Sequence, residues 1–157
     1  MWSMFAYTFI NKTDVELVIP FYYSLKSLGI NEEFNFVFQH RDVFRLVKML
    51  RLKTNLHLHE DESTSFLEFK LEKPGSFLYI APFYKLAKNP IPLFKDALLN
   101  SEIVYFKNKN NYDFWGANFT EDFSFFKNAY ILSEFDKFLE KTEGNTFVLP
   151  SADLLAT

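Results

Sequence analysis

Two histidines separated by one residue, His57-Leu58-His59, are the feature of the sequence with the clearest chemical potential. On a β-strand, residues two apart point to the same face, so both imidazoles can approach one metal ion. The acidic run Glu60-Asp61-Glu62 follows at once and offers carboxylate ligands. A small metal-dependent hydrolase or nuclease that uses His57 and His59 is therefore one alternative function, although a catalytic metal needs a third ligand at a fixed distance.

The same histidines have a plainer interpretation, in which they lie on the solvent face of a hairpin strand and the acidic run forms its charged turn. Exposed carboxylates of this kind suit a positively charged protein partner. A second candidate contact is the aromatic and acidic segment that follows the asparagine-rich turn at 108–111, because tyrosine and tryptophan are favoured at protein interfaces. The predicted partner-binding residues are Glu60, Asp61, Glu62, Tyr112, Asp113 and Trp115.

A basic segment at residues 41–53 offers a third possibility. Its cations are Arg41, Arg45, Lys48, Arg51 and Lys53, with one acid, Asp42, among them. Such a helix can track a phosphate backbone, which makes a nucleic-acid-binding accessory protein a further alternative. An ordinary solvated helix face explains the same residues, so nucleic acid is not the expected partner.

The absent motifs favour a binding protein over an enzyme, without deciding the question. The chain has no cysteine, no glycine-rich phosphate loop and no G-x-S-x-G nucleophile motif. Its net charge is −3, and the acidic excess lies in residues 101–157, so no general attraction to nucleic acid or anionic lipid is expected. We therefore predict a non-catalytic protein-binding module without a cofactor, such as a bacterial immunity protein that neutralises a basic toxin domain by direct binding.

The beginning of the chain carries no signal for export. It is apolar but lacks a basic segment before the apolar stretch and a small-residue cleavage site. No apolar run approaches the ~18–20 residues of a spanning helix. These features predict a cytoplasmic protein without membrane association, and they leave its oligomeric state open.

The first half of the chain alternates strand and helix patterns. Residues 2–10 and 33–39 alternate as strands, the second as a half-buried one. Thr13 and Glu16 have capping-box spacing ahead of a helical pattern that reaches Gly29. Pro20 allows two interpretations of that helix, a late start at the proline or an early start at Asp14. A second helix begins at Asp42 as its N-cap.

The second half indicates antiparallel pairing. The β-rich runs 55–59, 65–72 and 76–82 predict a meander, and 101–107 and 112–117 predict a hairpin. Helices are expected at 93–99 and 134–142, while 121–132 fits helix or loop. The predicted fold is α+β, a mainly antiparallel sheet of about five or six strands with about three or four packed helices. We expect residues 1–150 to form one domain and residues 151–157 to form a flexible C-terminal tail.

Overall fold

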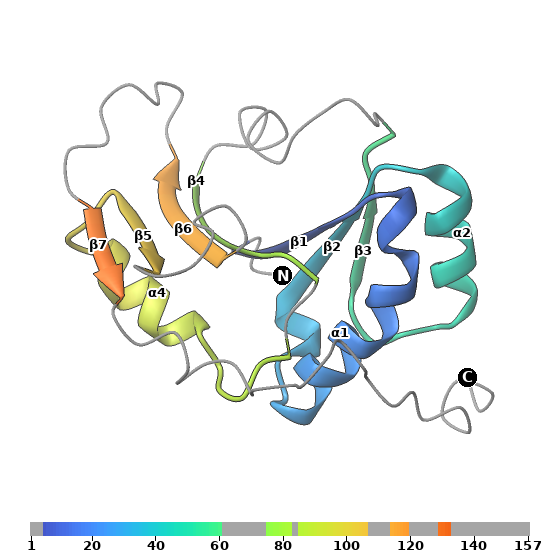
Figure 1. Ribbon diagram of the computed structural model, residues 1–157, viewed down its shortest axis with the longest axis horizontal. Helices are drawn as coiled ribbons and strands as arrows, with labels where there is room; N and C mark the ends of the chain where they lie inside the picture. Colours follow the sequence, from blue (N-terminus) through green and yellow to red (C-terminus); the bar gives the residue numbers. More distant parts are fainter. Residues whose placement is uncertain (1–4, 61–74, 83–84, 107–113, 120–128, 133–157) are drawn as a thin grey trace.

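The computed structural model describes residues 5–60, 75–82, 85–106, 114–119 and 129–132 (Figure 1). Within them the strands are β1 (Ala6–Ile10), β2 (Phe34–Phe38), β3 (Asn55–Leu58), β4 (Gly75–Ile80), β5 (Ile103–Phe106), β6 (Phe114–Phe119) and β7 (Ala129–Leu132). The α-helices are α1 (Val15–Ser27), α2 (Arg41–Met49) and α4 (Ile91–Leu98). Two 3₁₀ turns, η1 (Lys12–Asp14) and η2 (Asn31–Glu33), precede α1 and β2.

The seven strands form one mixed sheet in the order β3-β2-β1-β4-β6-β5-β7. The first four strands in that order are parallel to one another, and β6 runs antiparallel to both β4 and β5. The α+β class is confirmed, but the prediction of a mainly antiparallel sheet is wrong. Helices α1 and α2 return the chain to the edge where it started, so β1, β2 and β3 must be parallel.

The predicted meander over 55–82 is wrong for its second connection, because β4 pairs with β1 and with β6 and so has a neighbouring strand on each side. Strand β3 pairs in parallel with β2, whereas β4 pairs with β1, so two strands lie between β3 and β4. The middle run of the predicted meander, 65–72, lies outside the described residues. The first connection of the meander, from 55–59 to 65–72, therefore stays a prediction.

Strand β1 passes into α1 through a capping box. The side-chain oxygen of Asn11 accepts a hydrogen bond from the Thr13 amide at 2.9 Å, and the Asp14 carboxylate accepts one from the Asn11 amide at 3.3 Å. The cap thus lies two residues before the predicted Thr13/Glu16 pair. Helix α1 contains Pro20 in its interior, which confirms the early start among the two alternatives.

All three described α-helices pack on one face of the sheet. From β1 and β2 this face receives Ala6, Ile10 and the rings of Phe34, Phe36 and Phe38. Phe21 of α1 contacts Phe34 and Phe36 with ring centroids 5.8 Å apart in each pair. Figure 1 shows α1 and α2 beside β1–β3, with α4 below the β5–β6 half. The alternating phenylalanines thus build the core between helices and sheet.

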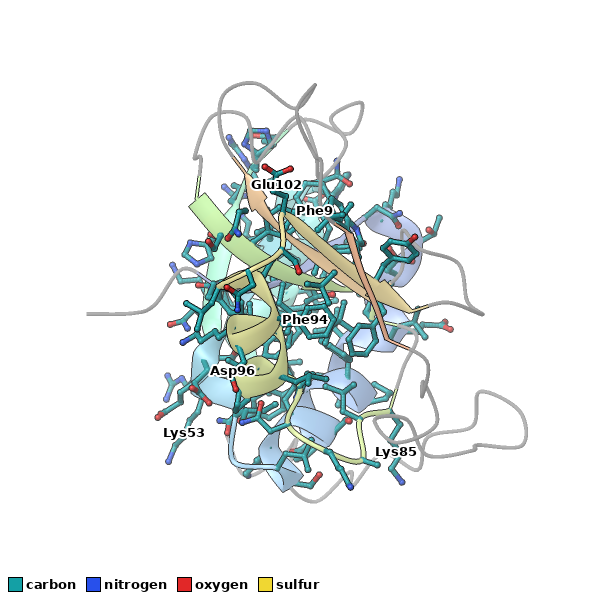
Figure 2. The ribbon with its side chains drawn as sticks, turned by 90° about the vertical axis from the view of Figure 1, so that its left-hand side faces the viewer. Phe9, Lys53, Lys85, Phe94, Asp96 and Glu102 are labelled. Carbon is teal, nitrogen blue, oxygen red and sulfur yellow. The ribbon has the colours of Figure 1, made fainter. Side chains whose placement is uncertain are left out.

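The opposite face of the sheet is also buried. Its apolar cluster consists of Tyr7, Phe9, Val37, Phe77, Trp115 and Ala117. Figure 2 shows Phe9 near the top of the sheet and Phe94 on the side where α4 lies. Strand β2 is buried along its whole length, so the expectation of a half-buried strand at 33–39 is wrong. A strand between two parallel neighbours has both faces covered.

The remaining predicted elements have mixed outcomes. Helix α2 starts one residue before the predicted cap, with His40 at the N-cap, and α4 matches the helix expected at 93–99. Strands β5 and β6 form the predicted antiparallel pair. Strand β7 lies in the segment 121–132, which was predicted to be helix or loop, so that prediction is wrong for residues 129–132. The helix at 134–142 and the tail at 151–157 lie outside the described residues. No helix in the described ranges has the length and apolar character needed to cross a membrane.

Candidate functional site

The strand order reverses between β1 and β4, and this position defines the candidate site. From β1 the chain builds β2 and β3 on one side, and it then adds β4 on the other side of β1. A reversal of this kind marks a candidate ligand site at the carboxyl edge between β1 and β4, which we call the candidate crevice. Ligands of open parallel sheets bind in such a crevice, outside the carboxyl ends of the strands.

Polar residues follow β1, β2 and β3 at this edge. Asn11, Lys12 and Thr13 come after β1 and are all exposed. The register aligns Ile10 with Phe38 and Phe38 with Leu58, so the residues after β2 and β3 reach the same edge. They are Gln39 and His40 after β2, and His59 and Glu60 after β3. The carboxyl ends of three neighbouring strands are therefore followed by polar residues at the same edge of the sheet.

The start of α1 gives this edge a positive potential. The 3₁₀ turn η1 and helix α1 are continuous in sequence, so the backbone amides at their start and the positive end of the helix dipole lie at the carboxyl end of β1, where Lys12 is exposed. The Asn11 and Asp14 side chains each take up one of these amides. Burial raises the pKa of Asp14 above its ordinary value, while the hydrogen bond from the Asn11 backbone lowers it. This arrangement can hold an anionic group such as a phosphate.

An exposed ion pair borders the edge on the β3 side. The Arg41 guanidinium contacts the Glu60 carboxylate at 2.7 Å, and both side chains are about half exposed. An exposed pair of this kind contributes about 0–1 kcal/mol to stability. The pair connects the start of α2 to the residues that follow β3.

The β4 side of the crevice is apolar where the structure describes it. Ala81 and Pro82 follow β4 and are buried. Further along, the Leu86 amide donates a 2.7 Å hydrogen bond to the Ser24 hydroxyl of α1, which fixes this segment beneath the sheet. Among the described residues, no group of three histidine, aspartate or glutamate side chains lies close enough to hold a metal ion.

Of the two predicted metal-binding histidines, His57 lies on β3, the outermost described strand on its side of the sheet, and His59 follows β3 at the carboxyl edge. The His57 ring nitrogen Nε2 lies 3.0 Å from the Asn35 side-chain oxygen, and the Asn35 amide group donates to the Ala6 carbonyl at 3.0 Å. The His59 backbone amide donates to the Phe38 carbonyl at 2.8 Å. His57 thus takes part in a contact across β1, β2 and β3. A metal site at His57 and His59 stays a prediction.

The predicted partner-binding residues are only partly described. Glu60 is exposed and paired with Arg41. Trp115 is 7% exposed and packs edge-on against Phe77, with ring centroids 4.9 Å apart. Asp61, Glu62, Tyr112 and Asp113 lie outside the described residues. The two described residues are not neighbours, because Glu60 follows β3 and Trp115 lies on β6, with three strands between them. The binding of a toxin domain stays a prediction.

The arrangement of the sheet is shared with known glycosyltransferase structures. The described fold is an α+β fold whose parallel half has polar residues after β1, β2 and β3 at the carboxyl edge. The crystal structure of the glycosyltransferase GlyE of Streptococcus pneumoniae matches 75% of this chain with a TM-score of 0.54 at 10% identity. Its apo form matches 72% with a TM-score of 0.51 at 13% identity. No protein-family model and no curated protein matches the sequence.

The likeness concerns the fold and only part of the larger protein. This chain corresponds to 34% of the GlyE chain in the first match and 33% in the second. It therefore spans about a third of the length of the structures that it matches.

Sequence reasoning did not find the residues after β1. The Asn11-Lys12-Thr13 tripeptide fits a glycosylation acceptor pattern, and Thr13 was assigned to a helix cap. The signal that identifies these residues is the strand–helix–strand–helix–strand order over residues 2–59. That order predicts parallel strands, and parallel strands place the residue after β1 at a ligand-binding edge.

Proposed function

We propose that this chain binds a nucleotide-linked sugar, as the nucleotide-binding part of a glycosyltransferase-type protein. The observation that carries the proposal is the reversal of strand order between β1 and β4, with α1 starting at the crevice. The β1-α1-β2-α2-β3 unit has the arrangement of a mononucleotide-binding half-domain. The fold match to the glycosyltransferase GlyE supports the sugar-transfer context.

The residues after β1 are assigned to the diphosphate of the ligand. Lys12 is exposed next to the first backbone amides of η1, so its ammonium group and those amides act on the same anion. The exposed Asn11 and Thr13 supply neutral donors and acceptors. The Thr13 hydroxyl donates a 2.6 Å hydrogen bond to the side-chain oxygen of Asn11, which holds the turn in place before a ligand binds.

The polar residues after β2 and β3 are assigned to the nucleoside or the sugar. Gln39 and His40 follow β2 at the same edge, and Glu60 and Arg41 border it. Hydroxyl-rich ligands need several hydrogen-bonding groups on more than one element, and this edge provides them from two neighbouring strands. The chain's own residues thus support binding, and we assign no residue to the transfer step.

The test is binding of a panel of nucleotide-linked sugars to the full chain. UDP-glucose, GDP-mannose and dTDP-glucose are titrated separately while backbone amide signals are followed by nuclear magnetic resonance, and affinities are measured by calorimetry. We expect the largest shifts at Asn11, Lys12 and Thr13. Free glucose serves as the control for a site that recognises only the sugar.

A charge-reversal pair locates the site. Lys12→Glu is expected to weaken binding by about tenfold or more, because it replaces a charge-assisted contact with repulsion. Lys26→Glu makes the same charge change in the last turn of α1, at the opposite end of the helix, and should leave the affinity unchanged. Equal losses in both variants, or shifts confined to other parts of the sheet, would contradict the proposal.

A further inference from the structure

Positive charge is concentrated on the outer side of α2, although the whole chain has a net charge of −3. Arg45 and Lys48 are exposed on the helix, and Arg51 and Lys53 are exposed just beyond it, whereas Arg41 pairs with Glu60 and lies next to the exposed Asp42. The helix turns Val43 and Val47 into the core. Figure 1 shows α2 as the outermost element on its side of the described structure, and Figure 2 shows Lys53 pointing away from the sheet.

Two large apolar side chains project among these cations. Met49 is 76% exposed and Leu46 is 54% exposed. They are three residues apart on the helix, so they lie next to each other, and Met49 also follows Arg45 by four residues. The Lys48 ammonium group lies 5.7 Å from the centre of the Phe44 ring on the other flank. The α2 surface, defined as Arg45, Leu46, Lys48, Met49 and Arg51, thus combines apolar and cationic groups.

Arg51 adds an independent observation. Its φ angle is 53°, in the left-handed region that glycine and asparagine adopt most easily at the end of a helix. A glycine at this position would satisfy the backbone without strain. The chain instead keeps a cation there, at the end of the same exposed surface. A strained, non-glycine residue next to a charged patch points to a requirement for the side chain.

We propose that the α2 surface docks on an anionic lipid surface. Lysine and arginine contact acidic headgroups, while exposed methionine and leucine enter the boundary with the acyl chains. Nucleic acid would use the cations but gain nothing from Met49 and Leu46. A symmetric contact with a second copy would place cations against cations. This inference concerns a different surface from the nucleotide site and does not rest on it.

A protein partner fits the α2 surface less well. A stable protein interface buries about 800 Å² on each side around a well-packed apolar centre. The α2 surface presents two exposed large apolar side chains on a single helix, which is convex. A fluid headgroup layer adapts to a convex helix without a shaped pocket, so lipid is the occupant that the shape and charge favour.

The test is co-flotation of the full chain with lipid vesicles. One set contains phosphatidylcholine with about one-third phosphatidylserine, and the other contains phosphatidylcholine alone, both at about 0.1 M salt. We expect binding to the anionic vesicles only. The double variant Arg45→Glu/Lys48→Glu should lower the partition coefficient by about 30-fold or more, since each cation near an anionic surface contributes about fivefold.

Matched variants separate the patch from net charge. Lys85→Glu/Lys88→Glu makes the same change in net charge at two exposed lysines, and Figure 2 shows Lys85 well apart from Lys53. This control should bind as the unmodified chain does. Met49→Gln and Leu46→Gln keep the charge and the helix, and each should weaken binding that persists at high salt. Circular dichroism confirms that every variant is folded.

Three results would overturn the proposal. The first is an absence of binding to anionic vesicles. The second is an equal loss of binding in the Lys85/Lys88 control, which would assign the effect to net charge. The third is binding to polyuridylic acid, but not to vesicles, that Arg45→Glu/Lys48→Glu removes, since this would assign the surface to nucleic acid.

Discussion

The hydrogen bond between Ser24 and Leu86 holds the segment after β4 against α1, and its removal gives a measurable test of the site's architecture. Ser24 is 4% exposed and Leu86 is 2% exposed. The Leu86 amide donates to the Ser24 hydroxyl at 2.7 Å, in a fully buried setting. Ser24→Ala removes the acceptor and leaves a buried amide without this partner.

The expected loss follows from desolvation. An unsatisfied buried donor costs about 1–3 kcal/mol, and alanine returns up to ~0.5 kcal/mol through its higher helix propensity. We therefore expect Ser24→Ala to lower the free energy of unfolding by about 1–2 kcal/mol. The local effect should be larger exchange of the Leu86 amide with solvent, because this amide then opens without losing a strong bond.

Ser27 provides a control on the same helix. Its hydroxyl donates to the Ser24 carbonyl at 2.8 Å, and its side chain is exposed. Ser27→Ala makes the same chemical change, so much of the propensity gain cancels in the comparison, and the free energy of unfolding should stay within about 0.5 kcal/mol. Urea denaturation of both variants measures the difference. Equal stabilities for the two variants would refute the argument that the buried Leu86 amide depends on Ser24.

Three further changes test the packing and the buried ionisable groups. Gly116→Ala places a Cβ atom 2.6 Å from the Phe77 carbonyl oxygen and 2.9 Å from a Phe94 ring carbon, so calorimetric stability should fall by about 1–3 kcal/mol, and an effect below ~0.5 kcal/mol would contradict this contact. Burial raises the pKa of Asp14 from 3.8, so the folded state holds this proton more tightly than the unfolded chain. The Asp14 contribution to the free energy of unfolding should therefore decrease as pH rises through the folded-state pKa. Asp14→Asn should remove that decrease in urea titrations between about pH 3.5 and 6.5, and an unchanged pH profile would argue against it. Burial raises the pKa of Tyr7 from 10.0 to about 12, so Tyr7→Phe should remove part of the stability loss between these pH values, as measured by alkaline denaturation.

Local sequence patterns determined most of the secondary structure of the described residues. Phe34, Phe36 and Phe38 alternate with polar or smaller residues because a strand has a period of two, and the structure places all three on the helix face. Val43 and Val47 recur at helical spacing on α2, and both face the core. The hairpin of β5 and β6 follows from two β-rich runs that are close in sequence. Each of these features depends on contacts between near neighbours.

The pairing of distant strands was not contained in these patterns. A strand that alternates can be half-buried in an antiparallel sheet or central in a mixed one, and β2 shows the second outcome. Asn35 is fully buried, and its side-chain amide donates to the Ala6 carbonyl 29 residues away. The local alternation of Phe34 with Asn35 does not predict this burial, because the partner is distant in the sequence. Burial of a polar group depends on a partner from another strand.

The chemistry-bearing residues divide in the same way. His57, His59 and Glu60 attracted notice because they are adjacent in sequence, yet His57 contacts Asn35 and Glu60 contacts Arg41. The candidate crevice instead begins at Asn11, Lys12 and Thr13, which form no catalytic motif. The sequence by itself determined most of the described strands and helices, β7 excepted, since that information is local. Only the tertiary structure decided which strand ends meet, because parallel pairing joins residues far apart in the chain and creates the edge where a ligand can bind.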